Sequence, residues 1–182
     1  YPDVDIIVVD NDSDDPETLA YLGALDPTRH RVFHHSGAFN YSAINNRAVS
    51  EAQGRLLCLL NNDVETTEPY WLATLAAACL VVERDKFLTV GGLDERNFAV
   101  AFNDVDLCLR LNQRGRQSLY EPRAVLIHHE SVSRGLDKDP VGAARFAGEL
   151  AALKRIWKTD EIVDPYHHPQ LSRASEQFAV AL

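Results

Sequence analysis

Short apolar runs that end abruptly in polar residues are the main feature of this sequence. Residues 4–10 (VDIIVVD) form a continuous β-branched run, and residues 55–60 (RLLCLL) form a second apolar run. Such runs are typical of strands that are covered on both faces. Each run is followed at once by polar residues, at 11–15 and at 61–63. We therefore predict buried strands with polar side chains grouped just beyond their ends.

Two helices are predicted from their start signals. A helix is expected to begin near Pro16, because Asp14 precedes Glu17 at the spacing of a capping box and proline favours the first helical turn. Ser42 is expected to cap a second helix over residues 43–52.

The second half of the chain continues the alternation of strands and helices. The pattern predicts a strand over Cys79–Glu83, an amphipathic helix over 104–114, a strand over 123–127 and a final helix over Pro140–Trp157. This alternation predicts an α/β fold with a Rossmann-type, mostly parallel sheet flanked by helices, and with its ligand site at the carboxyl edge. We assign residues 1–163 to this core and residues 164–182 to an irregular C-terminal extension.

Composition and charge narrow the range of partners. The 182-residue chain has a net charge of −9 and no basic face for a nucleic-acid backbone, so we exclude nucleic acid as a partner. Its apolar runs are too short to span a bilayer, and no basic-then-apolar leader opens it, so a cytoplasmic location is expected. Cys58, Cys79 and Cys108 each lie in an apolar run and are expected to be buried thiols.

Six segments together resemble the family 2 glycosyltransferases of the GT-A fold, notably their bacterial rhamnosyltransferase-like members. Any one of these segments would be weak, but all six stand in the order of the family and cover most of the chain. They are IIVVDNDSDD (6–15), FNYSAINNRAVSEAQGRLLCLLNNDVE (39–65), VGGLDE (90–95), NDVDLCLRL (103–111), EPRAVLIHHESVSRG (121–135) and DPYHHPQLS (164–172).

The resemblance also implies that parts of the family fold are missing. Such enzymes carry a strand and a helix ahead of the position of Tyr1, and several dozen residues between a helix near Trp71 and the strand at Cys79. In this chain, residues 70–83 (YWLATLAAACLVVE) instead join a helix-like half to a strand-like half without a turn. We therefore expect a GT-A-like fold that is incomplete at the N-terminus and near residues 75–78.

A metal site is implied at two strand ends. Asn61-Asn62-Asp63 stands where the family has its DXD-like motif, and His128 stands where a histidine joins the metal ligands. The departing diphosphate is strongly anionic, and a divalent cation held by carboxylate oxygen offsets that charge. The resemblance implies that Asp63 and His128 bind Mn²⁺ or Mg²⁺, while Asn61 and Asn62 hydrogen-bond the ribose or a metal-bound water. A polar turn and a structural histidine are the alternatives.

Donor contacts are implied for the first strand end and the second helix. Asp10, with Asn11 beside it, stands where an acid of the family contacts the nucleoside. Asn46 and Arg47 resemble an Asn-Arg pair near the nucleotide, where arginine can clamp phosphate. The alternatives are an Asx-turn at Asp10 and a surface salt bridge at Arg47.

The acceptor side is implied at the start of the helix over 104–114. Asp104 is the candidate general base, because a carboxylate beside the attacking hydroxyl can take its proton. Asn103, His129, Glu130 and Arg134 are expected to contact the acceptor or to support the metal ligands. The alternatives are that Asp104 caps the helix and that Asp106 pairs with Arg110 one turn later, and for Asp106 we expect the pairing.

An inverting glycosyltransferase is the function that this resemblance implies. The expected donor is a nucleotide-sugar, either a UDP-sugar or dTDP-rhamnose, and the expected acceptor is a hydroxyl of a saccharide or a lipid-linked saccharide. The expected pathway is bacterial surface polysaccharide synthesis, with peripheral association at the inner face of the membrane.

Two other functions compete with this one. A sugar-phosphate nucleotidyltransferase can share the sheet, but it needs a Gly-rich basic phosphate loop after the first strand, and this sequence has none there. A non-catalytic nucleotide- or carbohydrate-binding module is the second competitor. Asn103, which stands where the family commonly has an acid, and the missing first strand favour such a module.

Overall fold

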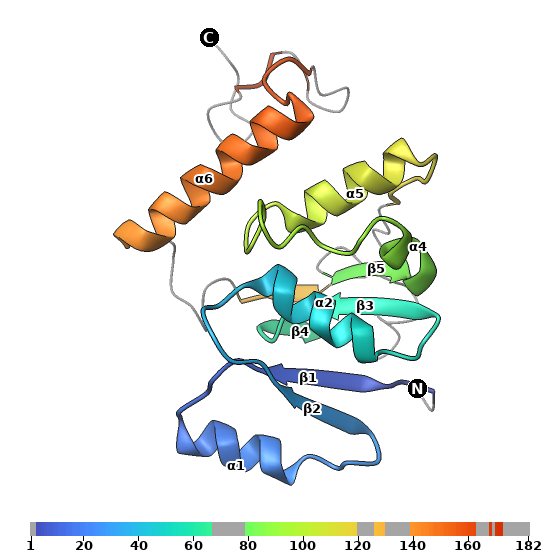
Figure 1. Ribbon diagram of the computed structural model, residues 1–182, viewed down its shortest axis with the longest axis vertical. Helices are drawn as coiled ribbons and strands as arrows, with labels where there is room; N and C mark the ends of the chain where they lie inside the picture. Colours follow the sequence, from blue (N-terminus) through green and yellow to red (C-terminus); the bar gives the residue numbers. More distant parts are fainter. Residues whose placement is uncertain are drawn as a thin grey trace.

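The computed structural model describes residues 3–66, 79–119, 126–129, 139–162, 168 and 170–172. Strands and helices alternate strictly in it only from residue 6 to residue 60, and Figure 1 shows β1, β2 and α1 at one end of the molecule and α6 at the other. The elements are β1 (Ile6–Asp10), α1 (Pro16–Ala24), β2 (His30–His34), α2 (Tyr41–Glu51), β3 (Leu56–Leu60), β4 (Val64–Thr66), β5 (Cys79–Glu83), α4 (Arg84–Thr89), α5 (Asn103–Gln113), β6 (Leu126–His128) and α6 (Pro140–Trp157).

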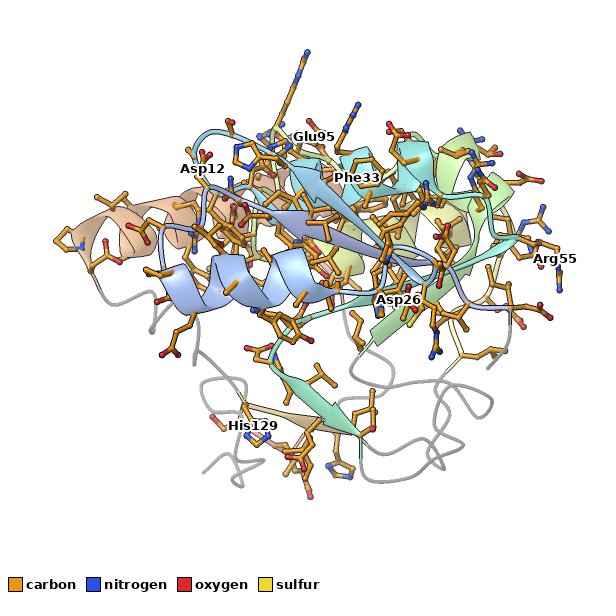
Figure 2. All side chains as sticks on the ribbon, turned by 90° about the horizontal axis from the view of Figure 1, so that it is seen from below. Asp12, Asp26, Phe33, Arg55, Glu95 and His129 are labelled. Atoms are coloured by element: carbon orange, nitrogen blue, oxygen red, sulfur yellow. The ribbon has the colours of Figure 1, made fainter. Side chains whose placement is uncertain are left out.

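β1 and β2 form a parallel pair, with α1 in the connection between them. Ile6 lies opposite His30, and Asp10 lies opposite His34. Because parallel strands end at the same edge of a sheet, the polar residues that follow β1 and β2 are brought together. Figure 2 shows Asp12 at this end of the pair and Asp26 at the other end.

The other described strand pairs are antiparallel. β3 pairs with β5, with Leu60 opposite Cys79, and β4 pairs with β6, with Val64 opposite His128. Two of the three described pairs therefore differ from the mostly parallel sheet that the sequence predicts. An apolar run indicates that a strand is covered, but it carries no information on the direction of the neighbouring strand.

The main hydrophobic core lies between β3, β5 and the helices α2, α4 and α5. Its buried members come from all these elements and from the loop after α4, so distant parts of the chain close on one cluster. They are Val49, Leu57, Leu59, Val82, Phe87, Leu93 and Leu107.

β3 is covered on one face, whereas the sequence predicts cover on both. Leu57 and Leu59 are buried, but Leu56 and Leu60 are exposed. Cys58 is also exposed, which corrects the prediction of a buried thiol, because successive side chains of a strand point to opposite faces. Cys108 is partly buried, and the side chain of Cys79 lies outside the described part of the structure.

A second, smaller core attaches α6 to the rest of the molecule. Phe98, from the loop that precedes α5, is fully buried with Ala152 and Leu153 of α6. Phe102 and Trp157 pack against this cluster. The loop before α5 therefore lies between two cores and is held from both sides.

The helix caps differ from the predicted ones by one or two residues. Asp15 caps α1 in place of Asp14, and Asn40 caps α2 in place of Ser42. Ser42 is instead buried, and its hydroxyl donates to the carbonyl of Phe98. Asp, Asn and Ser are all good caps, so the tertiary contacts decide which neighbour takes the position.

The remaining element predictions have mixed outcomes. α6 begins and ends where the sequence predicts, and the strands at Ile6–Asp10 and Cys79–Glu83 are confirmed. β2, β4 and α4 are not predicted from the pattern. Residues 75–78, where we expect a missing segment, and most of the predicted extension at 164–182 lie outside the described residues. The division at residue 163 stays a prediction.

Candidate active site

Asp63 and His128, the two predicted metal ligands, face each other in the structure. Asp63 follows β3 and directly precedes β4, and His128 ends β6, the strand that pairs with β4. The His128 Nε2 atom lies 3.0 Å from Asp63 Oδ1, and the Asp63 side chain is only 12% exposed. The β4–β6 ladder therefore brings together the two side chains that the sequence nominates separately.

Neighbouring polar side chains surround this pair. The Asn61 Nδ2 atom lies 3.3 Å from His128 Nε2. His129 donates its backbone N–H to the carbonyl of Asp63 (2.8 Å), and its Nε2 lies 3.0 Å from Glu65 Oε2. These contacts of His129 stabilise the turn at Asp63. Figure 2 shows His129 beside β4 and β6. The sequence does not single out Glu65 as a site residue, although Glu65 belongs to the same NNDVE segment as Asp63.

The pair fits part of a divalent cation site. Asp63 Oδ1 is buried and makes no hydrogen bond of normal geometry, although His128 Nε2 is close to it. A carboxylate oxygen and an imidazole nitrogen are both accepted ligands of Mn²⁺-like cations. Within the described ranges no group of three or more His, Cys, Asp and Glu side chains is arranged to hold a metal ion. A bound cation would therefore need further ligands from elsewhere.

A second polar group lies where β1 and β2 end. Asp10 accepts a hydrogen bond from the Ser13 N–H at 3.1 Å, which is the turn contact considered as an alternative role. Hydrogen bonding from Ser13, aided by His34, lowers the pKa of the Asp10 carboxyl, and burial only partly opposes this. Asp10 is therefore held as a carboxylate at the strand end.

His34 bridges two carboxylates in this group. Its Nδ1 lies 3.2 Å from Asp10 Oδ2, and its Nε2 lies 3.0 Å from Asp12 Oδ1. Ser36 Oγ lies 3.1 Å from the same Nε2 atom. The sequence reasoning missed His34 because no strand was predicted at His30–His34.

Asn11 fastens the loop after β1 to the loop after β2. Its Nδ2 donates to the carbonyl of His35 (2.7 Å) and to that of Gly37 (3.0 Å). Gly37, which has a φ of 115°, donates its N–H to Asp12 Oδ2. Asn11 was predicted to contact the nucleotide. In the structure its amide group shapes the loops on which Asp10 and Asp12 lie.

Asn46 and Arg47 also have protein partners. Asn46 exchanges hydrogen bonds with the backbone of Leu93 (2.8 Å in both directions) and donates to Glu95 Oε1 at 2.7 Å. Arg47 pairs with Glu51 one turn later at 3.2 Å, which is the surface salt bridge considered as an alternative. Asn46 therefore connects α2 to the loop after α4. The nucleotide contacts predicted for Asn46 and Arg47 remain predictions.

The start of α5 presents one exposed carboxylate and one buried carboxylate. Asp104 is exposed, and its Oδ1 accepts from the adjacent Val105 N–H at 2.8 Å. Asp106 is buried and accepts hydrogen bonds from Arg110 Nε (2.7 Å) and from Trp157 Nε1 (2.9 Å), so its predicted pairing with Arg110 is confirmed. Asn103 is buried and donates to the carbonyl of Val100. Of these side chains, Asp104 is the one available to a substrate.

Glu149 of α6 is a further residue that the sequence reasoning missed. It is 5% exposed, and its two carboxylate oxygens accept from the N–H groups of Val100 (3.0 Å) and Ala101 (2.9 Å). These residues lie just ahead of Asn103 and Asp104. The only signal in the sequence is a Glu on the side of α6 that carries Ala152, where an apolar residue would be expected.

A protein-family model matches the part of the chain that contains the ends of β1 and β6, the turn at Asp63 and the start of α5. The family model described as glycosyl transferase family 2 matches residues 1–132, which include Asp10, Asp63, Asp104 and His128. The chain belongs to glycosyl transferase family 2. Its α/β arrangement is that of the GT-A fold of this family.

Relatives of this family member include bacterial proteins of known and unknown role. An uncharacterized protein y4gI of Sinorhizobium fredii is 31% identical over 246 residues, covering 100% of this chain and 27% of that protein. The O-antigen biosynthesis protein RfbC of Myxococcus xanthus is 30% identical over 236 residues, covering 94% of the chain and 18% of that protein. An N-acetylglucosaminyl-diphospho-decaprenol L-rhamnosyltransferase of Mycobacterium tuberculosis is 46% identical over 63 residues, which are 35% of the chain and 20% of that enzyme.

The lengths of these matches bear on the predicted missing segment. The stretch matched to the Sinorhizobium protein is 246 residues long, whereas this chain has 182. That relative therefore carries several dozen residues, within the matched stretch, that this glycosyltransferase-family chain lacks. The chain spans about a quarter of the Sinorhizobium protein and about a fifth of the other two relatives.

The described contacts do not test the roles predicted for several site residues of this family member. Glu130 and Arg134 lie outside the described residues, and Asn62 is exposed in the turn between β3 and β4. Among the described hydrogen bonds and ion pairs, none joins Asp104 to Asp63 or His128. Among the described helices none is long and apolar enough to cross a membrane.

Proposed function

We propose that this chain forms the donor- and acceptor-binding core of an inverting glycosyltransferase. The donor is a nucleoside-diphosphate sugar, either a UDP-sugar or dTDP-rhamnose, and the acceptor is a hydroxyl of a lipid-linked saccharide in bacterial surface polysaccharide synthesis. The contact between Asp63 and His128 carries the proposal, because it joins the two residues to which the family resemblance assigns the metal. The names of the Myxococcus and Mycobacterium relatives support the acceptor class and the pathway.

The side chains divide the chemistry between them. Asp63 and His128 would hold a divalent cation, Mn²⁺ or Mg²⁺, which would supply positive charge to offset that of the departing diphosphate. Asp10, kept ionised by Ser13 and His34, accepts hydrogen bonds from the nucleoside. Asp104 takes the proton from the acceptor hydroxyl as that oxygen attacks the anomeric carbon from the face opposite the leaving group. That direction of attack gives inversion.

Calorimetry with UDP and dTDP tests the proposal through binding. Wild type is expected to bind one of these nucleotides at least tenfold more tightly with Mn²⁺ than with EDTA, because a cation held at Asp63 would offset the charge of the diphosphate. Asp63→Asn should remove this metal dependence, and Mn²⁺ binding followed by electron paramagnetic resonance should weaken with it. Asp85→Asn, which changes an exposed carboxylate on α4, is the matched control.

Two outcomes would contradict the proposal in different ways. Equal nucleotide affinity with and without Mn²⁺ in wild type would remove the metal role of Asp63 and His128. Metal-dependent nucleotide binding without sugar transfer to any hydroxyl acceptor would leave a non-catalytic binding module, the rival reading of the sequence.

A further inference from the structure

A groove lined by arginines lies beside the acceptor loop. It has a volume of about 500 Å³ and is bounded by Arg96, Asn97 and Ala99 on one side and by α6 between Arg145 and Arg155 on the other. Three guanidinium side chains line it, those of Arg96, Arg145 and Arg155. These three positive charges lie together in a chain whose net charge is −9.

Among the described contacts, Glu149, the carboxylate in the groove, pairs with Arg145 and not with Arg96 or Arg155. Both oxygens of Glu149 already accept from the N–H groups of Val100 and Ala101, and Arg145 Nε approaches Glu149 only to 3.8 Å. Arg155 donates to Asn97 Oδ1 in a long contact of 3.4 Å. Within the described residues neither Arg96 nor Arg155 has a carboxylate partner.

Small residues keep the groove open. Gly148 and Ala152 lie on the α6 face between Arg145 and Arg155, and both line the groove. A Cβ atom built on Gly148 would meet nothing within 4 Å, so space is open above this position. A planar guanidinium on each side of an open space suits an anion with several oxygens, because arginine binds phosphate through two parallel hydrogen bonds.

A short stretch of chain connects the groove wall to Asp104, the candidate base. Glu149, in the groove wall, holds Val100 and Ala101, and Asp104 follows these residues within about 14 Å of extended chain. The groove wall and the candidate base therefore belong to one contiguous region, formed by α6 and the residues that lead into α5.

We infer that this groove binds the diphosphate of the acceptor and so selects saccharides that are linked through a diphosphate. The inference rests on the proposed function, because it assumes that an acceptor hydroxyl lies at Asp104. Arg96 and Arg155 hydrogen-bond the phosphate oxygens, and Gly148 provides the space that the phosphates occupy.

Acceptor kinetics with two matched acceptors test this inference. The probes are N-acetylglucosamine linked through diphosphate to farnesol and the uncharged octyl N-acetylglucosaminide. Arg155→Gln is expected to raise the KM for the diphosphate acceptor about tenfold, because it removes a charged hydrogen-bond donor, and to leave the KM for the donor and for the octyl glycoside unchanged. Lys154→Gln is the matched control, since Lys154 pairs with Asp160 outside the groove.

Filling the groove gives an independent test that leaves its charge unchanged. Gly148→Leu is expected to raise the KM for the diphosphate acceptor at least as much as Arg155→Gln, while thermal stability is kept or increased, because glycine is a poor helix former and the space above it is open. Ala144→Leu is the matched control on the same helix, at an exposed position outside the groove lining.

The outcomes separate this inference from the proposed function. Equal KM changes for both acceptors, or no change in either, would overturn the inference. Absence of transfer by wild type to both acceptors would overturn the proposed function, and calorimetry with inorganic pyrophosphate in EDTA then decides on the groove: weaker binding by Arg155→Gln supports an anion site, and unchanged binding refutes it. Loss of binding to anionic phosphatidylglycerol vesicles by Arg155→Gln, with an unchanged acceptor KM, would assign the groove to a membrane surface and overturn the inference.

Discussion

At the scale of single residues, the candidate site depends on which carboxylates have protein partners and which remain available. Asp106 is buried between Arg110 and Trp157 and serves packing, while Asp104, two positions earlier, is exposed. Asp10 is held ionised by Ser13 and His34. Neighbouring acids in one segment therefore differ in role because their burial and hydrogen-bond partners differ, and not because of their residue type.

Asp104→Asn tests the role of the exposed carboxylate. The variant is expected to lose sugar transfer by a factor of a hundred or more, on the order of a general base contribution, because the amide cannot take the acceptor proton. Its affinity for the nucleotide, measured by calorimetry, should stay within about twofold of wild type, because Asp104 accepts only its neighbour's N–H among the described contacts. Loss of both properties would count against the base assignment.

At the scale of elements, the loop before α5 is held by partners that are distant in the sequence. α2 contacts it through Ser42 and Asn46, and α6 contacts it through Glu149. Phe98 anchors it in the second core. The position of the candidate base thus depends on the packing of two helices, one on each side of the loop.

Glu149→Ala tests how much α6 contributes to this loop. The variant leaves the N–H groups of Val100 and Ala101 without their carboxylate, and it should lower the free energy of unfolding by about 1–3 kcal/mol, as measured by urea denaturation. Glu161→Ala, at an exposed position after α6, is the control and should change stability by less than about 0.5 kcal/mol. A loss in Glu149→Ala no larger than in the control would show that α6 does not hold the loop.

At the scale of the whole molecule, carboxylates on many elements are stabilised in their charged form. The pKa is lowered at seven acids, each through hydrogen bonds or nearby positive charge: Asp5, Asp10, Asp15, Asp26, Glu83, Asp94 and Asp139. At Asp94, burial favours the neutral form, but hydrogen bonds from Asn97 and Arg96 outweigh it. Folding is therefore coupled to the ionisation of these groups.

The stability of the molecule is expected to fall in acid. A carboxyl group whose pKa is lower in the folded state stabilises the fold above its unfolded pKa of about 4, and this contribution is lost as the pH falls through the folded pKa. Urea denaturation at pH 6, 5, 4 and 3 should show the free energy of unfolding decreasing most steeply below about pH 4. Asp94→Asn should flatten this dependence, and a stability that rises toward pH 3 would contradict the assignment.

The local pattern of the sequence determined the elements whose own residues carry the signal. α6 and the strands at Ile6–Asp10 and Cys79–Glu83 were predictable because apolar periodicity and capping residues are local properties. The order of motifs also predicted the family and named Asp63 and His128 separately, before any contact between them was known.

Only the tertiary structure decided which of these residues meet and which are already occupied. It chose antiparallel neighbours for β3 and β4, because strand direction leaves no mark in an apolar run. It paired Asn46 with Leu93, and it brought His34 and Glu149 into contact with partners that lie far from them in the sequence. Hydrogen bonds between residues far apart in the chain depend on how helices and sheets pack. The pattern of a single sequence indicates which residues are buried, but not which residues they contact.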